Sequence, residues 1–274
     1  MRSRQIESGT EVRGQGLHSA APSAVRFERR EGPSAVRAGS VVLPLADLVV
    51  ADTTRSTTLA SRDGRVRIGT VEHVFAALSG LGAHTGVLVT FEGPEAPLAD
   101  GGAACFCDAL AAVARKDVRA DPPLLVVRDG EIVVGSSAYL FEKGGSIRVE
   151  VDVDFGDERL ARGARWNGDA KDFRARIATA RTFGFEREIA DLLTRGLASH
   201  VSPESVVLIG AQRIFSAGAP FFADEPARHK LLDLLGDMFL YGGPPRGTVR
   251  AHRPGHAATH EAMQRALCDG IIAT

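Results

Sequence analysis

The chain alternates between short apolar runs and longer stretches in which apolar residues recur every three or four positions. The short runs predict strands, and the longer periodic stretches predict amphipathic helices. In the N-terminal half, this pattern predicts strands at 24–28, 41–43, 56–59, 66–68 and 86–91 and helices at 70–81 and 103–116. In the C-terminal half, it predicts strands at 124–127, 131–134, 147–155 and 205–209 and helices at 172–180, 186–195, 229–241 and 260–269.

The order of these elements predicts the fold class. Strands are grouped apart from helices in each half, which favours an α+β fold over a parallel βαβ alternation. A polar, proline-containing break at Arg119-Ala120-Asp121-Pro122-Pro123 separates the halves. We therefore predict two α+β domains, over residues 1–120 and 121–274, whose similar order of elements hints at an internal duplication.

Composition narrows the class of protein. The chain has 274 residues, 44% of them hydrophobic and 24% charged, which is typical of a soluble globular protein. A net charge of -1 gives no electrostatic case for binding nucleic acid. No apolar run approaches the roughly 20 residues of a membrane span, and no signal peptide is evident, so we expect a cytoplasmic protein. Its cysteines, Cys105, Cys107 and Cys268, fit reduced thiols better than metal ligands.

The predicted helix 229–241 carries an unusual polar stripe. His229, Asp233 and Asp237 are spaced four residues apart and therefore share one helix face. Apolar residues surround this stripe, from Leu231 to Leu240. A buried polar group without a partner costs roughly 1–3 kcal/mol. The stripe therefore indicates a metal or a dense hydrogen-bond network.

A second cluster lies at the start of the predicted helix 70–81. Thr70 is a good N-cap residue, which puts Glu72 and His73 in the first helical turn. The positive end of the helix dipole favours a carboxylate and a neutral imidazole there, and neutral imidazole is the form that binds metal. With His229 and Asp233, His73 would complete a three-ligand zinc site, and Glu72 could take a proton from water. Each cluster alone also fits a purely structural pair.

Three further features have both functional and structural interpretations. His256 follows Pro254-Gly255, which predicts a loop histidine that either faces a site or is simply solvated. Thr182 follows a predicted helix, where the alternative is a helix-ending turn with two core aromatics. His18 and the loop 93–101 by themselves predict turns.

Together, these residues resemble a known family. In order along the chain, six motifs are similar to those of UDP-3-O-acyl-N-acetylglucosamine deacetylase, the zinc amidase that commits bacteria to lipid A synthesis. The motifs are Thr70-Val71-Glu72-His73, Gly93-Pro94-Glu95-x-Pro97-x-x-Asp100-Gly101, Ala180-Arg181-Thr182-Phe183-Gly184-Phe185, Arg195-Gly196-Leu197, Arg228-His229-Lys230-x-x-x-Asp233-x-x-Gly236-Asp237 and Gly255-His256.

The resemblance implies two similar α+β domains, each a sheet packed on helices, with the active site between them. It also implies a monomer that hydrolyses a carbon-nitrogen bond of a UDP-linked acylated amino sugar. The cofactor implied is Zn²⁺, with Fe²⁺ able to use the same ligands. By motif, the resemblance implies that the zinc ligands are His73, His229 and Asp233 and that the general base is Glu72. Lys230 and Thr182 would stabilise the oxyanion, and His256, held by Asp237, would assist the leaving amine. The implied substrate contacts are Phe183 and His18.

The motifs depart from the family pattern away from the metal and proton-transfer positions. Ala198-Ser199-His200-Val201 stands where a small, glycine-rich loop is usual, and Ser136-Ser137 replaces a basic residue near the nucleotide phosphates. These departures leave acyl chain length open. They also leave open a diverged zinc deacetylase that acts on another acylated amino sugar. A non-catalytic nucleotide-sugar-binding paralogue is disfavoured, because Glu72, the ligands and Lys230 are all present.

Overall fold

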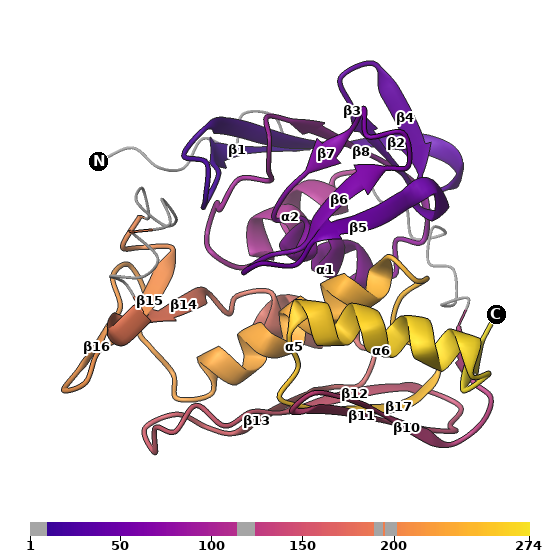
Figure 1. The fold of residues 1–274 in the computed structure, drawn as a ribbon. Helices are drawn as coiled ribbons and strands as arrows, with labels where there is room; N and C mark the ends of the chain where they lie inside the picture. Colours follow the sequence, from indigo (N-terminus) through magenta and orange to yellow (C-terminus); the bar gives the residue numbers. More distant parts are fainter. Residues whose placement is uncertain (1–9, 114–123, 189–193, 195–201) are drawn as a thin grey trace.

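The protein has an α+β architecture in which helices lie between two five-stranded sheets (Figure 1). The structure is a computed structural model and describes residues 10–113, 124–188, 194 and 202–274. The predicted fold class is confirmed. The predicted break at 119–123 and the motifs at 195–201 lie outside the described residues, so the division at 120/121 stays a prediction.

The two large sheets share one topology. In each sheet, one antiparallel hairpin lies on either side of a central strand, which is the last of the five strands in sequence. The central strand runs parallel to the adjacent strand of one of these hairpins. The first sheet has the order β1-β2-β8-β3-β4, with β1 Glu11–Gln15, β2 Pro22–Pro33, β3 Ala35–Ala38, β4 Val41–Pro44 and β8 Thr85–Glu92. The second has the order β10-β11-β17-β12-β13, with β10 Gly130–Val134, β11 Ser137–Glu142, β12 Ile147–Asp152, β13 Gly163–Trp166 and β17 Gly247–His252.

In the described part of the chain, the longer helices lie between these sheets (Figure 1). They are α1 Glu72–Gly80, α2 Ala104–Ala111, α5 Glu225–Phe239 and α6 His256–Cys268. In the second half, α5 packs on β12 and β13 while α6 packs on β10, and in the first half α2 packs on β1 and β2. The principal helix contact is between α1 and α5, which belong to different halves of the chain.

Smaller elements precede the two helices that meet. A three-stranded sheet, β5 Leu48–Asp52, β6 Thr58–Ser61 and β7 Arg67–Ile68, leads into α1. Another, β14 Thr182–Phe185, β15 Val206–Ile209 and β16 Ile214–Phe215, comes before α5 and has a small apolar core of its own. Other elements with bounds within the described residues are η1 Leu45–Asp47, β9 Leu125–Val126, α3 Ala170–Asp172, η2 Phe173–Ile177 and β18 Ile272–Ala273.

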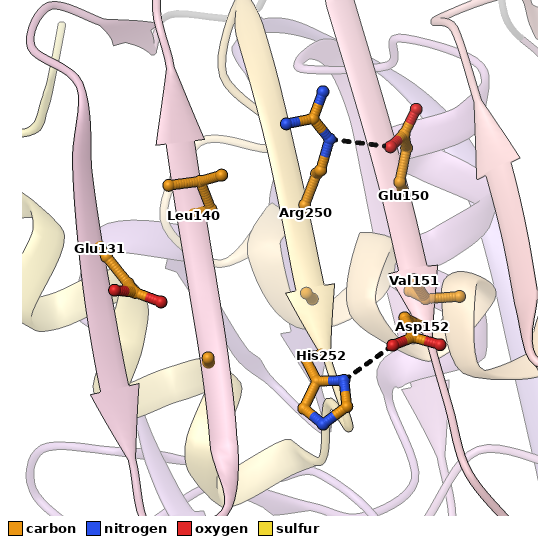
Figure 2. Close-up of a pocket in the computed structure, with 9 residues that line it drawn as sticks. Glu131, Leu140, Glu150, Val151, Asp152, Arg250 and His252 are labelled. Atoms are coloured by element: carbon orange, nitrogen blue, oxygen red, sulfur yellow. Dashed lines mark hydrogen bonds and ion pairs between the residues drawn. The ribbon is translucent and has the colours of Figure 1, made fainter.

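The second large sheet has one buried face and one solvated face. Tyr139 and Val249 point into the core, whereas residues on the other face line a hollow shown in Figure 2. In that hollow Arg250 Nε donates to Glu150 at 3.0 Å, and His252 Nδ1 lies 2.8 Å from Asp152 Oδ2. Charged side chains on this face therefore pair with one another, and none of the residues that line the hollow belongs to the predicted site.

Several predicted boundaries were wrong. The helix predicted at 229–241 begins at Glu225, because Pro226 occupies its first turn, where proline is tolerated. The helix predicted at 260–269 begins at His256, so this residue is not in a loop. Thr182–Phe185 form strand β14, paired in parallel with β15, so the alternative of a helix-ending turn at Thr182 is wrong. The central strand β17 and its neighbour β11 were missed.

The backbones of α1 and α5 touch at Gly236. A Cβ at this position would overlap the carbonyl oxygen of Glu72 and would lie 3.1 Å from the amide nitrogen of Ala76. Both clashing groups are backbone atoms, which cannot rotate away. Only glycine allows the two helices to approach this closely.

We therefore expect Gly236→Ala to reduce the free energy of unfolding by about 1–3 kcal/mol, since overpacking forces the helices apart. Chemical denaturation will measure this change. Gly145→Ala is the matched control, because a Cβ there meets no atom within 4 Å. Equal stability of the two variants would show that the helix contact tolerates a side chain.

Candidate active site

The three predicted ligands converge at the contact between α1 and α5. His73 comes from the first turn of α1, and His229 and Asp233 come from α5; one ligand atom of each lies within 4.8 Å of the others. Asp233 Oδ1 lies 3.6 Å from His73 Nε2 and 3.4 Å from His229 Nε2. All three residues are buried. Two imidazole nitrogens and one carboxylate oxygen so close together fit a zinc ion.

The orientation of His229 is set by the backbone. Its Nδ1 lies 3.0 Å from the carbonyl oxygen of Ala180, which can only accept, so Nδ1 carries the proton and Nε2 keeps its lone pair. Burial lowers the pKa of His229 to about 4. The imidazole is therefore neutral near pH 7, as a metal ligand must be.

Lys230 places a positive charge beside the ligand carboxylate. Its Nζ donates to Asp233 Oδ2 at 2.8 Å, which leaves Oδ1 facing the two imidazoles. Burial favours neutral Asp233, but Lys230 and His229 hold the pKa of this carboxyl well below its usual value. The pKa of Lys230 is raised despite burial, because Asp233 stabilises the ammonium. Both groups are charged at neutral pH.

Glu72 lies at the start of α1 and is 3% exposed. Burial raises the pKa of its carboxyl, although His256 and His73 act in the opposite direction. Its Oε2 accepts the backbone N–H of Thr57 at 2.9 Å. A carboxylate with a raised pKa is suited to accept a proton near neutral pH.

The prediction that Thr70 caps this helix was wrong. Val71 occupies the N-cap position without a side-chain cap, and the Thr70 hydroxyl donates to Glu95 Oε2 at 2.7 Å. Thr70 also has a φ of +54°, an uncommon conformation for a β-branched residue. Glu95 Oε1 accepts the backbone N–H groups of His18 and Ser19 at 3.0 and 2.6 Å, so this carboxylate ties the His18 turn to the start of α1.

Asp237 is buried and His256 is largely so, and their side chains form a pair. His256 Nδ1 lies 2.8 Å from Asp237 Oδ2. Burial would lower the pKa of His256, but Asp237 raises it to about 9. His256 also lines one pocket together with Lys230 and Asp233. The imidazole is therefore protonated at neutral pH beside the predicted ligands.

The structure also describes the predicted substrate contacts Phe183 and His18, the predicted oxyanion residue Thr182, and Ser137, where the sequence departs from the family pattern. The Phe183 ring packs edge-on to His229, with centroids 6.0 Å apart, and thus borders the ligand group. Thr182 is anchored through its backbone N–H, which donates to the carbonyl of Gly101 at 2.7 Å. Both ring nitrogens of His18 are buried without a hydrogen-bond partner among the described residues. Ser137 donates to the carbonyl of Arg253 at 2.8 Å, which is a structural contact.

The sequence did not reveal an ion pair that anchors the site from behind. Arg181 and Glu225 are both buried, and Arg181 Nε donates to Glu225 Oε1 at 2.8 Å. This pair joins the start of β14 to the first turn of α5, and thereby holds Ala180 against His229. The position of Arg181 within a quoted motif was the only available signal. Thr57 and His260 also contact Asp237, and no feature of the sequence indicated either of them.

Comparison with known proteins agrees with these features. The sequence model of LpxC, UDP-3-O-acyl N-acetylglycosamine deacetylase, matches residues 3–268. A protein named UDP-3-O-acyl-N-acetylglucosamine deacetylase from Myxococcus xanthus is 35% identical over 97% of this chain and 86% of its own length. Proteins with the same name from Anaeromyxobacter sp. and Brucella melitensis are 32% and 31% identical, over 97% and 93% of this chain and 88% and 92% of their own lengths.

The raised pKa of His256 predicts how stability depends on pH. A group whose pKa is raised on folding contributes stability below its unfolded pKa of about 6.5, and this contribution is lost as pH rises through the folded value. We expect the unfolding free energy of the metal-free protein to exceed that of His256→Gln near pH 6, and this difference to shrink by about 2–4 kcal/mol by roughly pH 10.

Chemical denaturation across this pH range will measure that difference. His252→Gln is the matched control, because the exposed ion pair of His252 with Asp152 should contribute little. A difference between the native protein and His256→Gln that does not change with pH would contradict the prediction.

Proposed function

The chain belongs to the UDP-3-O-acyl N-acetylglycosamine deacetylase family, and from this membership we propose that it hydrolyses the N-acetyl amide of a UDP-linked 3-O-acyl-N-acetylglucosamine. The products are acetate and a free amine, and the reaction serves lipid A synthesis in the cytoplasm. The observation that carries the proposal is the convergence of three potential metal ligands with a buried carboxylate, an ammonium and an imidazolium. No helix in the described part of the chain is long and apolar enough to cross a membrane.

His73, His229 and Asp233 would hold the metal, which we propose to be Zn²⁺. When bound, Zn²⁺ supplies Lewis acidity that polarises the acetamide carbonyl and lowers the pKa of water. Two contacts suit these residues to metal binding. The carbonyl of Ala180 orients the neutral His229 ring, and the ammonium of Lys230 keeps Asp233 ionised.

Glu72 acts as the general base in this proposal. Its carboxylate takes the proton from the attacking water, and its raised pKa brings it closer to the pH at which it must both accept and release a proton. The hydrogen bond from the Thr57 N–H holds one carboxylate oxygen, which leaves the other to accept the proton.

Charge that develops on the substrate oxygen is stabilised by Lys230, together with Thr182. Preorganised donors act most strongly in a buried site, where little solvent must reorganise. His256 is already protonated and donates a proton to the departing amine nitrogen. Asp237 stabilises the imidazolium of His256 before this proton is transferred. The carboxylate that supports the acid is therefore a different one from Glu72, the base.

Apolar surface beside His229 supports an acylated substrate. Phe183 packs between His229 and Phe155, and it borders the small core formed by Leu160, Phe185, Val207 and Ile209. The buried ring nitrogens of His18 lack a partner among the described residues, and a polar group of the sugar would supply one. We propose that these two positions contact the acylated sugar.

Acetate release from UDP-3-O-acyl-N-acetylglucosamine by purified protein tests this function. We expect activity that a chelator abolishes and added Zn²⁺ restores, while Fe²⁺ added without oxygen tests the alternative metal. Protein that retains full activity after its metal is removed would exclude the proposed mechanism. Activity only toward a different acylated amino sugar would instead identify a diverged deacetylase.

Glu72→Gln should bind metal as the native protein does but lose about 10²–10⁴-fold in kcat, the usual contribution of a general base. The glutamine can still accept the Thr57 N–H, so the local structure is kept. Metal analysis and steady-state kinetics will separate the two effects. Glu261→Gln, on the exposed side of α6, is the control and should leave kcat unchanged. Near-native kcat in metal-loaded Glu72→Gln would require another base.

A further inference from the structure

Thr57 lies immediately before β6 and is 2% exposed. All of its polar groups are used. The backbone N–H donates to Glu72 Oε2 at 2.9 Å, and the carbonyl accepts the N–H of Val71 at 3.2 Å. The hydroxyl donates to Asp237 Oδ1 at 2.6 Å. One residue therefore contacts the start of α1 and the polar stripe of α5.

These contacts join the two carboxylates of the proposed proton transfers. Glu72 is the proposed base, and Asp237 holds the proposed acid, His256, through its other oxygen at 2.8 Å. Among hydrogen bonds between described residues, Thr57 alone bonds to both carboxylates. A small movement of Thr57 would therefore displace the base and the acid together.

The surrounding donors determine where the hydroxyl proton goes. Thr57 Oγ1 lies 3.4 Å from His256 Nδ1 and 3.2 Å from His260 Nε2. His256 Nδ1 donates to Asp237 Oδ2, and it cannot also accept a proton. His260 Nδ1 lies 3.2 Å from the Tyr241 hydroxyl, and His260 Nε2 lies 3.4 Å from Asp237 Oδ1, which favours a proton on Nε2. Asp237 is thus the acceptor for the Thr57 hydroxyl.

We propose that Thr57 is a positioning residue that aligns the general base and the general acid of this site. Its hydroxyl fixes the Asp237 carboxylate so that Oδ2 faces His256, while its backbone N–H orients Glu72. The kinetic part of this role rests on the proposed function. The hydroxyl can be removed without touching the backbone bond, so the two contributions are separable.

Thr57→Val removes the hydroxyl and keeps nearly the same volume. We expect kcat to fall by about 10–100-fold, because small misplacements near reacting groups have effects of this size. KM and metal content should be unchanged. Thr57→Ser keeps the hydroxyl and should restore kcat to near the native value. Thr58→Val, the neighbouring residue in β6, is the matched control and should behave as native.

Two further measurements distinguish positioning from a general structural role. In a His256→Gln background, adding Thr57→Val should reduce kcat much less than it does in the native protein, because the effect acts through His256. Without substrate, the downfield proton resonance of His256 Nδ1–H should be present in native protein and Thr57→Ser and be displaced in Thr57→Val. This resonance does not depend on turnover, so it tests the effect of the Thr57 hydroxyl on the Asp237–His256 pair even if acetate release is not observed.

The proposal is overturned if Thr57→Val keeps native kcat and an unchanged resonance. It is also overturned if Thr57→Ser is as impaired as Thr57→Val, since the methyl group would then be the essential part. If thermal denaturation shows that Thr57→Val does not fold, Thr57→Ala, which also lacks the hydroxyl and is smaller, takes its place in the same comparisons.

Discussion

The close approach of α1 and α5 is the constraint on which the site depends. Because Gly236 has no side chain, its backbone packs against the carbonyl of Glu72. This contact places the first turn of α1, with Glu72 and His73, against the stripe of α5 that carries His229, Asp233 and Asp237. The site therefore needs no long connecting loops, and its geometry has the rigidity of two packed helices.

Burial of charged groups makes this arrangement costly unless every charge has a partner. Lys230 pairs with Asp233 and His256 pairs with Asp237, while Arg181 and Glu225 pair behind the site. Buried ion pairs are weak sources of stability, because the desolvation penalty offsets the attraction. Three such pairs around one helix are better explained by chemistry than by stability, since Asp233 raises the pKa of Lys230 and Asp237 raises that of His256.

The matching topology of the two large sheets shows how each half contributes to the site. In each half a small three-stranded sheet stands before the helix that enters the α1–α5 contact. The first, β5-β6-β7, brings Thr57 to Glu72 and Asp237. The second, β14-β15-β16, follows Ala180 and Arg181 and carries Thr182 and Phe183. A small sheet in each half thus positions different side chains.

Local sequence was sufficient to determine the α+β class, the position of α1 and the polar stripe of α5, because helical periodicity depends only on neighbouring residues. The residue types of the potential ligands were also evident, since His, Asp and Asp along one face of an apolar helix need partners. The starts of α5 and α6, the strand at Thr182 and the contact of Thr70 with Glu95 were not predicted. Thr57 and Asp237 are 180 residues apart in sequence, so local pattern could not predict their hydrogen bond. Only tertiary packing, which buries both residues side by side, brings the hydroxyl to the carboxylate.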